Sequence, residues 1–215
     1  MTHINRLTVG FLLLGGLHGQ GARIIGGAGW FQAGYAYVSG FDRLQNALQS
    51  QNLSIPTSSS GFTIGGGGGG YLGRIFIGGY GGGLRSAQIN AGFGTFMVGP
   101  VWRLSENFLL LFTVGMGGGG YDLTAEDKGN APQPAPAPTR SVRLSGGGWL
   151  AQSSLMGQYF FPGGFMMGLQ VGYEIQRWTG ESGTIQDHPT VMPQRFVVRL
   201  LIGGGSIIGK HDDRN

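Results

Sequence analysis

Hydrophobic and polar residues alternate with a period of two along most of this chain. In the stretch GFMMGLQVGYEIQRW, an apolar residue occupies every second position from Phe165 to Ile175. The positions between them from Gly168 to Glu174 hold glycine, glutamine or glutamate. The stretches SAQINAGFGTFMVG, NFLLLFTVGMGGGG and RFVVRLLIGG repeat this pattern. Strict alternation is typical of a β-strand with two different faces, so the pattern predicts an all-β fold.

Eight segments carry this strand pattern. They span residues 24–38, 60–71, 74–83, 87–99, 107–122, 142–160, 164–177 and 194–208. Each segment reaches the roughly 9 to 11 residues that a tilted strand needs to cross a bilayer core.

The connections between these segments alternate between short and long. Tight turns are predicted at Leu72–Gly73, 103–107 and 161–164, and a turn of intermediate length at 82–86. Long loops are predicted at 39–59, 123–141 and 178–193. This alternation predicts an up-and-down meander with one plain end and one elaborated end. Eight strands bring both termini to the plain end.

The first long loop interrupts the strand pattern. In GFDRLQNALQSQN, residues 40–52, the apolar residues Phe41, Leu44, Ala47 and Leu48 follow helical spacing. We expect a short amphipathic helix that plugs or caps the elaborated end. The alternative is a loop that folds over its own apolar residues.

Glycine dominates the stretch GFTIGGGGGGYLGRIFIGGYGGGL, residues 61–84. Glycine inside a strand costs roughly 0.5–1 kcal/mol relative to alanine, so this density needs a packing reason. We interpret the stretch as two strands joined at Leu72–Gly73. The glycines would let opposite walls approach, or let aromatic rings and the Arg74 side chain lie across bare backbone.

The two faces of an eight-stranded barrel differ in the volume available to them. Its interior is too narrow for every large apolar side chain, whereas glycine and hydrogen-bonded polar groups fit there. We therefore predict an outward apolar face and a polar interior, with a water-filled ligand site as the alternative use of some interior residues. The predicted interior polar network is Arg74, Gln88, Asn90, Gln152, Gln170, Glu174 and Arg199. The predicted lipid-facing or assembly face includes Phe108, Leu110, Phe112, Leu169, Val171 and Leu200.

Composition supports an apolar exterior and excludes several function classes. Only 11% of the 215 residues are charged, against roughly 25% in a typical soluble domain. The net charge of +4 comes from scattered residues, without the basic patch that nucleic-acid binding requires. Cysteine is absent, which excludes a disulfide scaffold and thiolate metal sites.

The chain divides into three predicted parts. Residues 1–22 resemble a secretory signal peptide, with an apolar run followed by small residues, and an ordered N-terminal segment is the alternative. Residues 23–209 form the predicted barrel domain, and residues 210–215 form a polar tail.

Several motifs resemble those of a known protein group. These are GFDRLQNAL, GFTIGGGGGGYLGRIFIGGYGGGL and GFGTFMVGPVWRLSENFLLLFTVGMGGGG, between Phe41 and about Gly120. Together they resemble a group of uncharacterised glycine-rich bacterial proteins that look like outer-membrane-type β-barrels. The resemblance implies this fold and no activity. One departure is the final stretch IIGKHDDRN, because outer-membrane barrels commonly end in an aromatic residue.

Candidate catalytic chemistry is sparse. GGGSIIGKH, residues 203–211, has the glycine and lysine spacing of a phosphate-binding loop, but His211 stands where Ser or Thr should hold magnesium. The four histidines share no metal-ligand spacing, and no pair of strand carboxylates exists for acid–base catalysis. We therefore predict no enzyme activity, no cofactor, and no catalytic, cofactor-binding or metal residues.

Three functional hypotheses follow. The first is a non-enzymatic eight-stranded outer-membrane-type barrel that acts in surface display, adhesion or envelope structure, with the lipid bilayer as its partner. The second is a structural subunit that assembles with itself into an extracellular filament or layer. The third is a soluble lipocalin-like barrel that binds a small apolar ligand. The sequence predicts no nucleic-acid partner and does not identify a ligand.

Overall fold

A computed structural model describes residues 23–49, 53–127, 141–180 and 190–210. Eight long strands make up most of the chain: β1 (Arg23–Ser39), β3 (Ser58–Gly73), β4 (Ile75–Arg85), β5 (Ile89–Arg103), β6 (Phe108–Asp127), β7 (Ser141–Phe160), β8 (Phe165–Gln176) and β10 (Gln194–Lys210). The remaining elements are helix α2 (Asp42–Gln49) and the two-residue strands β2 (Leu53–Ser54) and β9 (Thr179–Gly180).

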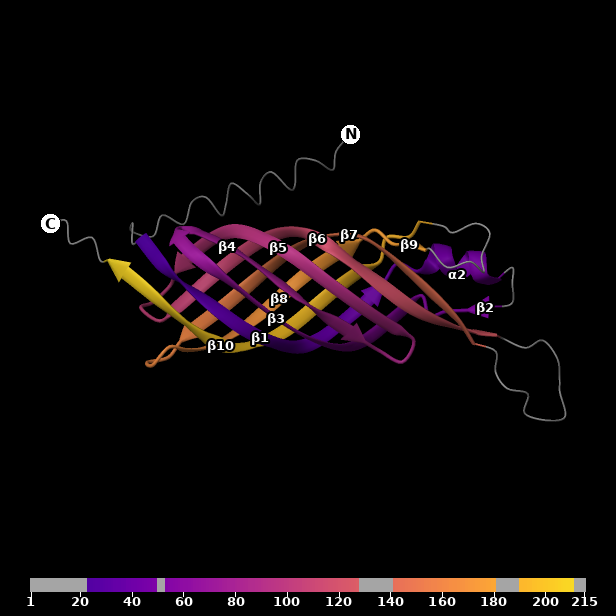
Figure 1. Ribbon diagram of the computed structural model, residues 1–215, viewed down its shortest axis with the longest axis horizontal. Helices are drawn as coiled ribbons and strands as arrows, with labels where there is room; N and C mark the ends of the chain where they lie inside the picture. Colours follow the sequence, from indigo (N-terminus) through magenta and orange to yellow (C-terminus); the bar gives the residue numbers. More distant parts are fainter. Residues whose placement is uncertain (1–22, 50–52, 128–140, 181–189, 211–215) are drawn as a thin grey trace, which may run out of the picture.

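The eight long strands form a closed antiparallel barrel. Each strand pairs with the next along the chain, and β1 closes the ring by pairing with β10 from Arg23↔Lys210 to Ser39↔Gln194. Figure 1 shows the elongated barrel with α2, β2 and β9 gathered at one end. The predicted eight-stranded up-and-down barrel is confirmed. Since Lys210 still pairs with Arg23, the barrel extends one residue past the predicted boundary at 209.

The tight turns lie together at the end opposite α2, as the sequence predicts (Figure 1). The glycine-rich hairpin turns at Gly73–Arg74, one residue later than predicted, because Leu72 pairs with Ile75. Gly73 has φ +65°. Glycine adopts a positive φ at the first central position of a two-residue hairpin without steric cost, which explains the shift.

All eight predicted strands are present, with ends that differ by a few residues. The period-two pattern cannot reveal β2 and β9, since each has only two residues. Pro100 lies within β5, where the pairing with β6 is interrupted between Val98↔Val114 and Val101↔Leu111. Proline has no N–H to donate, so it occupies a gap in the ladder.

Helix α2 closes the loop end of the barrel. Phe41, Leu44 and Leu48 are fully buried and pack in one cluster with strand residues such as Tyr121. The Phe41 and Tyr121 rings meet edge to face at 5.8 Å. Gln45 Oε1 also accepts a hydrogen bond from the Ile55 amide at 2.7 Å. The predicted amphipathic helix is therefore confirmed, and its apolar face caps the lumen.

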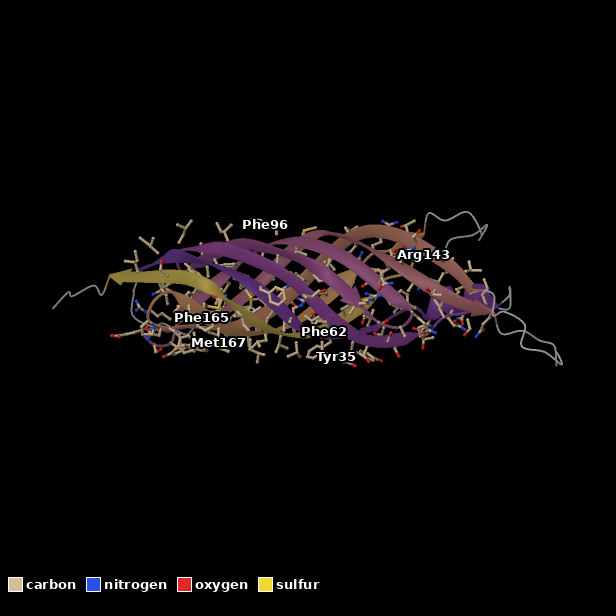
Figure 2. All side chains as sticks on the ribbon, turned by 60° about the horizontal axis from the view of Figure 1, so that its bottom comes forward. Tyr35, Phe62, Phe96, Arg143, Phe165 and Met167 are labelled. Carbon is tan, nitrogen blue, oxygen red and sulfur yellow. The ribbon has the colours of Figure 1, made fainter. Side chains whose placement is uncertain are left out.

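The outer wall carries large apolar side chains, as predicted for β6, β8 and β10. Leu169 is 52% exposed and Leu200 44% exposed, while the alternating residues Gln170 and Arg199 are buried. In Figure 2, labelled side chains such as Phe96 project outward from the ribbon.

The sidedness expected for β5 is wrong. The sequence places Ile89, Ala91, Phe93, Thr95 and Met97 on the apolar face that the other strands turn outward. The structure buries all five, and β5 instead presents Asn90, Gly92, Gly94 and Phe96 outside. The reason is volume: the inward faces of the neighbouring strands β4 and β6 are rich in glycine, so large side chains from β5 fill the space.

Inward glycines in the wall lie directly beneath large side chains. A Cβ at Gly69 would lie 2.5 Å from the Phe76 ring, and a Cβ at Gly67 would lie 3.1 Å from the Trp30 ring. Aromatic rings thus lie across bare backbone, as the sequence predicts. Arg74 does not take part, because it lies in the turn.

Candidate functional site

A buried ionic cluster centred on Glu174 lies inside the barrel. Glu174 on β8 is paired with two arginines of the adjacent strand β10. Arg195 Nη2 lies 2.7 Å from Glu174 Oε2, and Arg199 Nη2 lies 2.9 Å from Glu174 Oε1. All three side chains are about 1% exposed. Alternation on β10 places Arg195 and Arg199 four residues apart on the same inward face.

Arg199 is fully engaged with polar neighbours. Besides Glu174, its guanidinium donates hydrogen bonds to Tyr80 Oη at 3.1 Å, Gln170 Oε1 at 3.4 Å and Thr63 Oγ1 at 3.4 Å. These partners come from β4, β8 and β3. The contacts therefore connect opposite walls of the barrel through one side chain.

The Tyr80 hydroxyl links the carboxylate to a neutral hydrogen-bond network. It contacts Glu174 Oε1 and lies 2.5 Å from Gln152 Oε1. Gln152 Nε2 donates to Thr95 Oγ1 at 3.3 Å. A second chain links Gln170 to Ser154 at 3.1 Å. A buried charge is tolerated when it is paired and hydrogen-bonded, and these contacts meet that condition for Arg199 and for Glu174 Oε1. Glu174 Oε2 has the ion pair with Arg195 but no hydrogen bond.

Phe93 lies between the two arginines. The Arg195 guanidinium carbon is 4.4 Å from the Phe93 ring centre, and that of Arg199 is 5.3 Å away. The Arg199 guanidinium carbon also lies 4.9 Å from the centre of the Tyr80 ring. The Arg195 guanidinium carbon lies 5.7 Å from the centre of the Tyr121 ring. The electron-rich faces of the rings stabilise cations that have lost their water, which is a further reason for Phe93 to face inward.

Replacement of Phe93 should expose this role. We expect Phe93→Leu to lower the free energy of unfolding by about 2 kcal/mol, because desolvated cation–π contacts are lost together with ring packing. Phe96→Leu is the matched control, since Phe96 is on the same strand and 59% exposed. Urea unfolding of the refolded barrel, followed by tryptophan fluorescence, measures both. Equal losses in the two variants would contradict the role assigned to Phe93.

The structure brings together four of the seven residues predicted for the interior network: Gln152, Gln170, Glu174 and Arg199. The other three lie elsewhere. Arg74 is exposed in the β3–β4 turn, Gln88 lies in the turn before β5, and Asn90 is exposed on the outer face. Arg74 departs because the hairpin turns one residue later than expected, and Asn90 because the faces of β5 are reversed.

Sequence reasoning missed Arg195, Tyr80 and Phe93. Arg195 shares the alternation that identifies Arg199, but it lies at the very start of a predicted strand, where a face is hard to assign. Tyr80 lies between runs of glycine, which give no contrast between faces. No local signal reveals the contacts that Arg195 and Tyr80 make with Glu174, because contacts inside the barrel join residues far apart in the chain. Tyr80 and Glu174 are 94 positions apart.

The predicted lipid-facing residues lie on the outer wall of β6, β8 and β10. Five of them (Phe108, Leu110, Leu169, Val171 and Leu200) line a shallow groove of about 440 Å³. The sixth, Phe112, lies next along β6 on the same face. The side chains around this groove are apolar apart from the Tyr159 hydroxyl, so it offers hydrocarbon contact rather than polar recognition.

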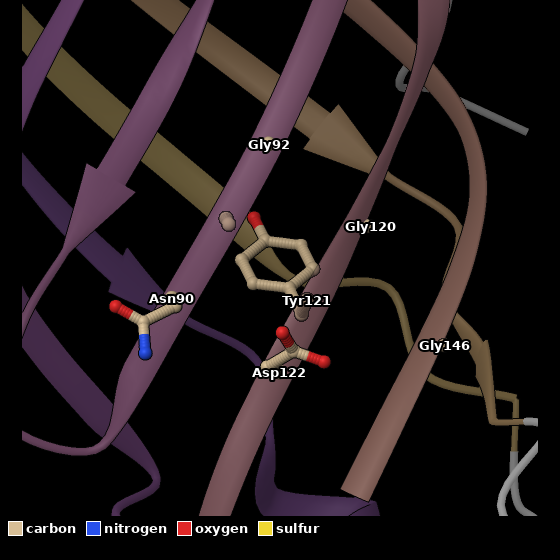
Figure 3. A pocket seen from close by; sticks show the side chains of 7 residues that line it. Asn90, Gly92, Gly120, Tyr121, Asp122 and Gly146 are labelled. Carbon is tan, nitrogen blue, oxygen red and sulfur yellow. The ribbon is translucent and has the colours of Figure 1, made fainter.

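A second depression lies where the barrel wall passes from glycine to polar residues. It has a volume of about 290 Å³ and includes Asn90, Gly92, Gly120 and Asp122. In Figure 3 the Asn90 and Asp122 side chains lie on neighbouring strands beside the bare glycine backbone. The Asp122 carboxylate is already paired with Arg143 at 2.6 Å.

No group of three or more metal-ligating side chains occurs anywhere in the described ranges.

Comparison with known proteins finds only distant structural similarity. No protein-family model matches the sequence, and no curated protein matches it significantly. The resemblance to the glycine-rich bacterial group therefore stays a prediction.

Among the solved structures with a similar fold, several are described as surface or outer membrane proteins. Neisserial surface protein A matches with 7% identity and a TM-score of 0.48, over 81% of this chain and 96% of that one. Ail, the attachment invasion locus protein of Yersinia pestis, has 15% identity and a TM-score of 0.39, over 84% and 99%. The outer membrane protease OmpT of Escherichia coli has 11% identity and a TM-score of 0.34, over 86% and 97%.

Proposed function

We propose that this chain is a non-enzymatic outer-membrane-type barrel of a bacterial cell envelope, with the lipid bilayer as the partner of its outer wall. The observation that carries the proposal is the distribution of side chains across that wall. Large apolar residues are exposed around the barrel, while Glu174, Arg195 and Arg199 are buried inside it. This is the reverse of a soluble barrel and matches a wall whose solvent is hydrocarbon.

Aromatic residues near the loop end further support a bilayer position. Tyr35, Tyr37, Trp149 and Tyr173 are each at least 40% exposed. Amphipathic rings favour the interface between hydrocarbon and headgroups. No helical segment within the described residues has the length and apolar character needed to span a bilayer.

The lumen is filled, so we propose a structural or adhesive role rather than transport. Two apolar clusters fill it, one towards the turns with Tyr71 and Phe76 and one at the loop end with Phe41 and Trp178. The long loops at 39–59, 123–141 and 178–193 would then act in surface display, adhesion or envelope structure. Parts of all three lie outside the described residues.

Spin labelling tests the bilayer proposal directly. The chain has no cysteine, so single variants Leu169→Cys and Leu200→Cys accept one nitroxide label each. In lipid vesicles we expect both labels to be more accessible to oxygen than to a water-soluble nickel complex. A label at Ser105→Cys in an exposed turn is the control and should show the reverse. High nickel accessibility at Leu169 and Leu200 would overturn the proposal.

Self-assembly is the alternative that one observation favours. Gly92 and Gly94 face outward, and a Cβ at either position would have open space around it. A flat glycine surface permits close approach of a second copy. Ordered assemblies that form without detergent would support this alternative.

The lipocalin-like hypothesis is not supported, because Leu169 and Leu200 point away from the lumen.

A further inference from the structure

A cluster of buried polar atoms without hydrogen-bond partners, most of them donors, lies at the loop end of the lumen. We define this donor cluster as Arg195, Tyr121, Trp178 and Gln176. Each is at most 2% exposed. All three guanidinium nitrogens of Arg195, the Tyr121 hydroxyl, the Trp178 indole nitrogen and both amide atoms of Gln176 are buried without a protein hydrogen-bond partner. Arg195 contacts Glu174, but that ion pair lacks hydrogen-bond alignment.

The members of the donor cluster meet although they come from different parts of the chain. The Arg195 guanidinium lies 5.7 Å from the Tyr121 ring centre. Tyr121 is paired across strands with Gly146, and the Trp178 indole nitrogen lies over that glycine, 2.5 Å from where its Cβ would be. Gln176 is the next inward residue of β8 after Glu174, the ion-pair partner of Arg195.

The charge of this region is unbalanced. Among the described residues, the buried side chains with a full charge at neutral pH are Glu174, Arg195 and Arg199, two cations against one anion. Arg199 donates hydrogen bonds to four polar partners, whereas the guanidinium nitrogens of Arg195 make none, so Arg195 is the less compensated cation. A net charge held away from water is costly unless a counter-charge accompanies it.

The donor types determine what can bind. Guanidinium and indole N–H groups donate and cannot accept, so they require an acceptor, and the positive charge of the guanidinium disfavours a cation. We propose that the donor cluster binds one small monovalent anion, a halide or a simple carboxylate, beneath the cap formed by α2. The anion neutralises the lumen and accepts hydrogen bonds from Arg195, Tyr121 and Trp178.

Refolding in different salts tests this site. The chain is refolded from urea into detergent in sodium bromide, in sodium formate, or in sodium gluconate, whose anion is too bulky to enter, at equal ionic strength. We expect bromide or formate to raise the midpoint of thermal unfolding by several degrees above gluconate. The salt with the larger shift identifies the ligand as halide or carboxylate. Crystals grown in bromide should show an anomalous peak within hydrogen-bond distance of Arg195.

Three variants separate the site from general salt effects. Arg195→Met should lose the anion-dependent shift, while Glu174 keeps its bond to Arg199. Arg85→Met removes the same charge from an exposed position and should keep the shift. If Arg195→Met does not refold, Tyr121→Phe serves instead and should raise the half-saturating bromide concentration about tenfold, since it removes one charge-assisted hydrogen bond. Equal stability in all three salts, or bromide bound only to the outer wall, would overturn the proposal.

Discussion

Glu174→Gln should be the most damaging single substitution in the lumen, with a loss of about 3–5 kcal/mol in the free energy of unfolding. The change keeps the shape of the side chain but leaves Arg195 and Arg199 without a carboxylate. Both arginines are about 1% exposed and cannot recover water without opening the barrel. Urea unfolding of the barrel refolded in lipid vesicles, compared with wild type, measures the loss.

Two further variants show whether charge balance causes the effect. Asp122→Asn removes the same charge from the exposed pair with Arg143, where the side chains are 36% and 71% exposed, and should cost less than about 1 kcal/mol. Adding Arg195→Met to Glu174→Gln should restore part of the lost stability, because one uncompensated cation is removed. An unfolding midpoint for Glu174→Gln equal to that of wild type would refute the ionic cluster as a structural centre.

Leu169→Arg should cost about 2–4 kcal/mol when the barrel is embedded in a bilayer. Leu169 is midway along the outward face of β8, beside Leu200 on β10 and Gly157 on β7. An arginine there would place its charge in hydrocarbon, away from the headgroups. Reversible unfolding from lipid vesicles gives the free energy.

Asn90→Arg is the matched control for this prediction. Asn90 also faces outward, but it lies level with the polar residues Arg85 and Asp122, its partners on the neighbouring strands. A new arginine at this level can reach water, so the expected cost is about 0–1 kcal/mol. A cost at Asn90 as large as that at Leu169 would contradict the assignment of the outer wall to a bilayer.

The barrel could be predicted from the sequence because alternation is a local property. A strand such as β8 exposes its two faces to different surroundings, so the residues from Phe165 to Ile175 record those surroundings in order. Alternating short and long connections then predicted the meander and the end at which β1 begins and β10 ends. The helix at α2 was visible for the same reason, since its apolar spacing is that of one helical face.

The interior network could be predicted only in part. Glu174 and Arg199 were identified because each lies on the polar face of a strongly alternating strand. Arg195 and Tyr80 were missed because the start of a strand and a glycine-rich stretch give little contrast between faces. Asn90 was wrongly placed because the glycines of the neighbouring strands leave room inside the barrel for the apolar face of β5. The functional consequence of the network depends on contacts across the lumen, and a single strand contains no record of its opposite wall.

The sequence by itself thus determined the number of strands, their antiparallel order, the capping helix and the apolar outer face of β6, β8 and β10. The tertiary structure decided which way β5 faces, since this depends on the volume that glycines of neighbouring strands leave inside the barrel. It also decided that Phe93 lies between two arginines and that Arg195 has unpartnered donors. Both features arise only when the ring closes and brings β5, β8 and β10 around a common lumen.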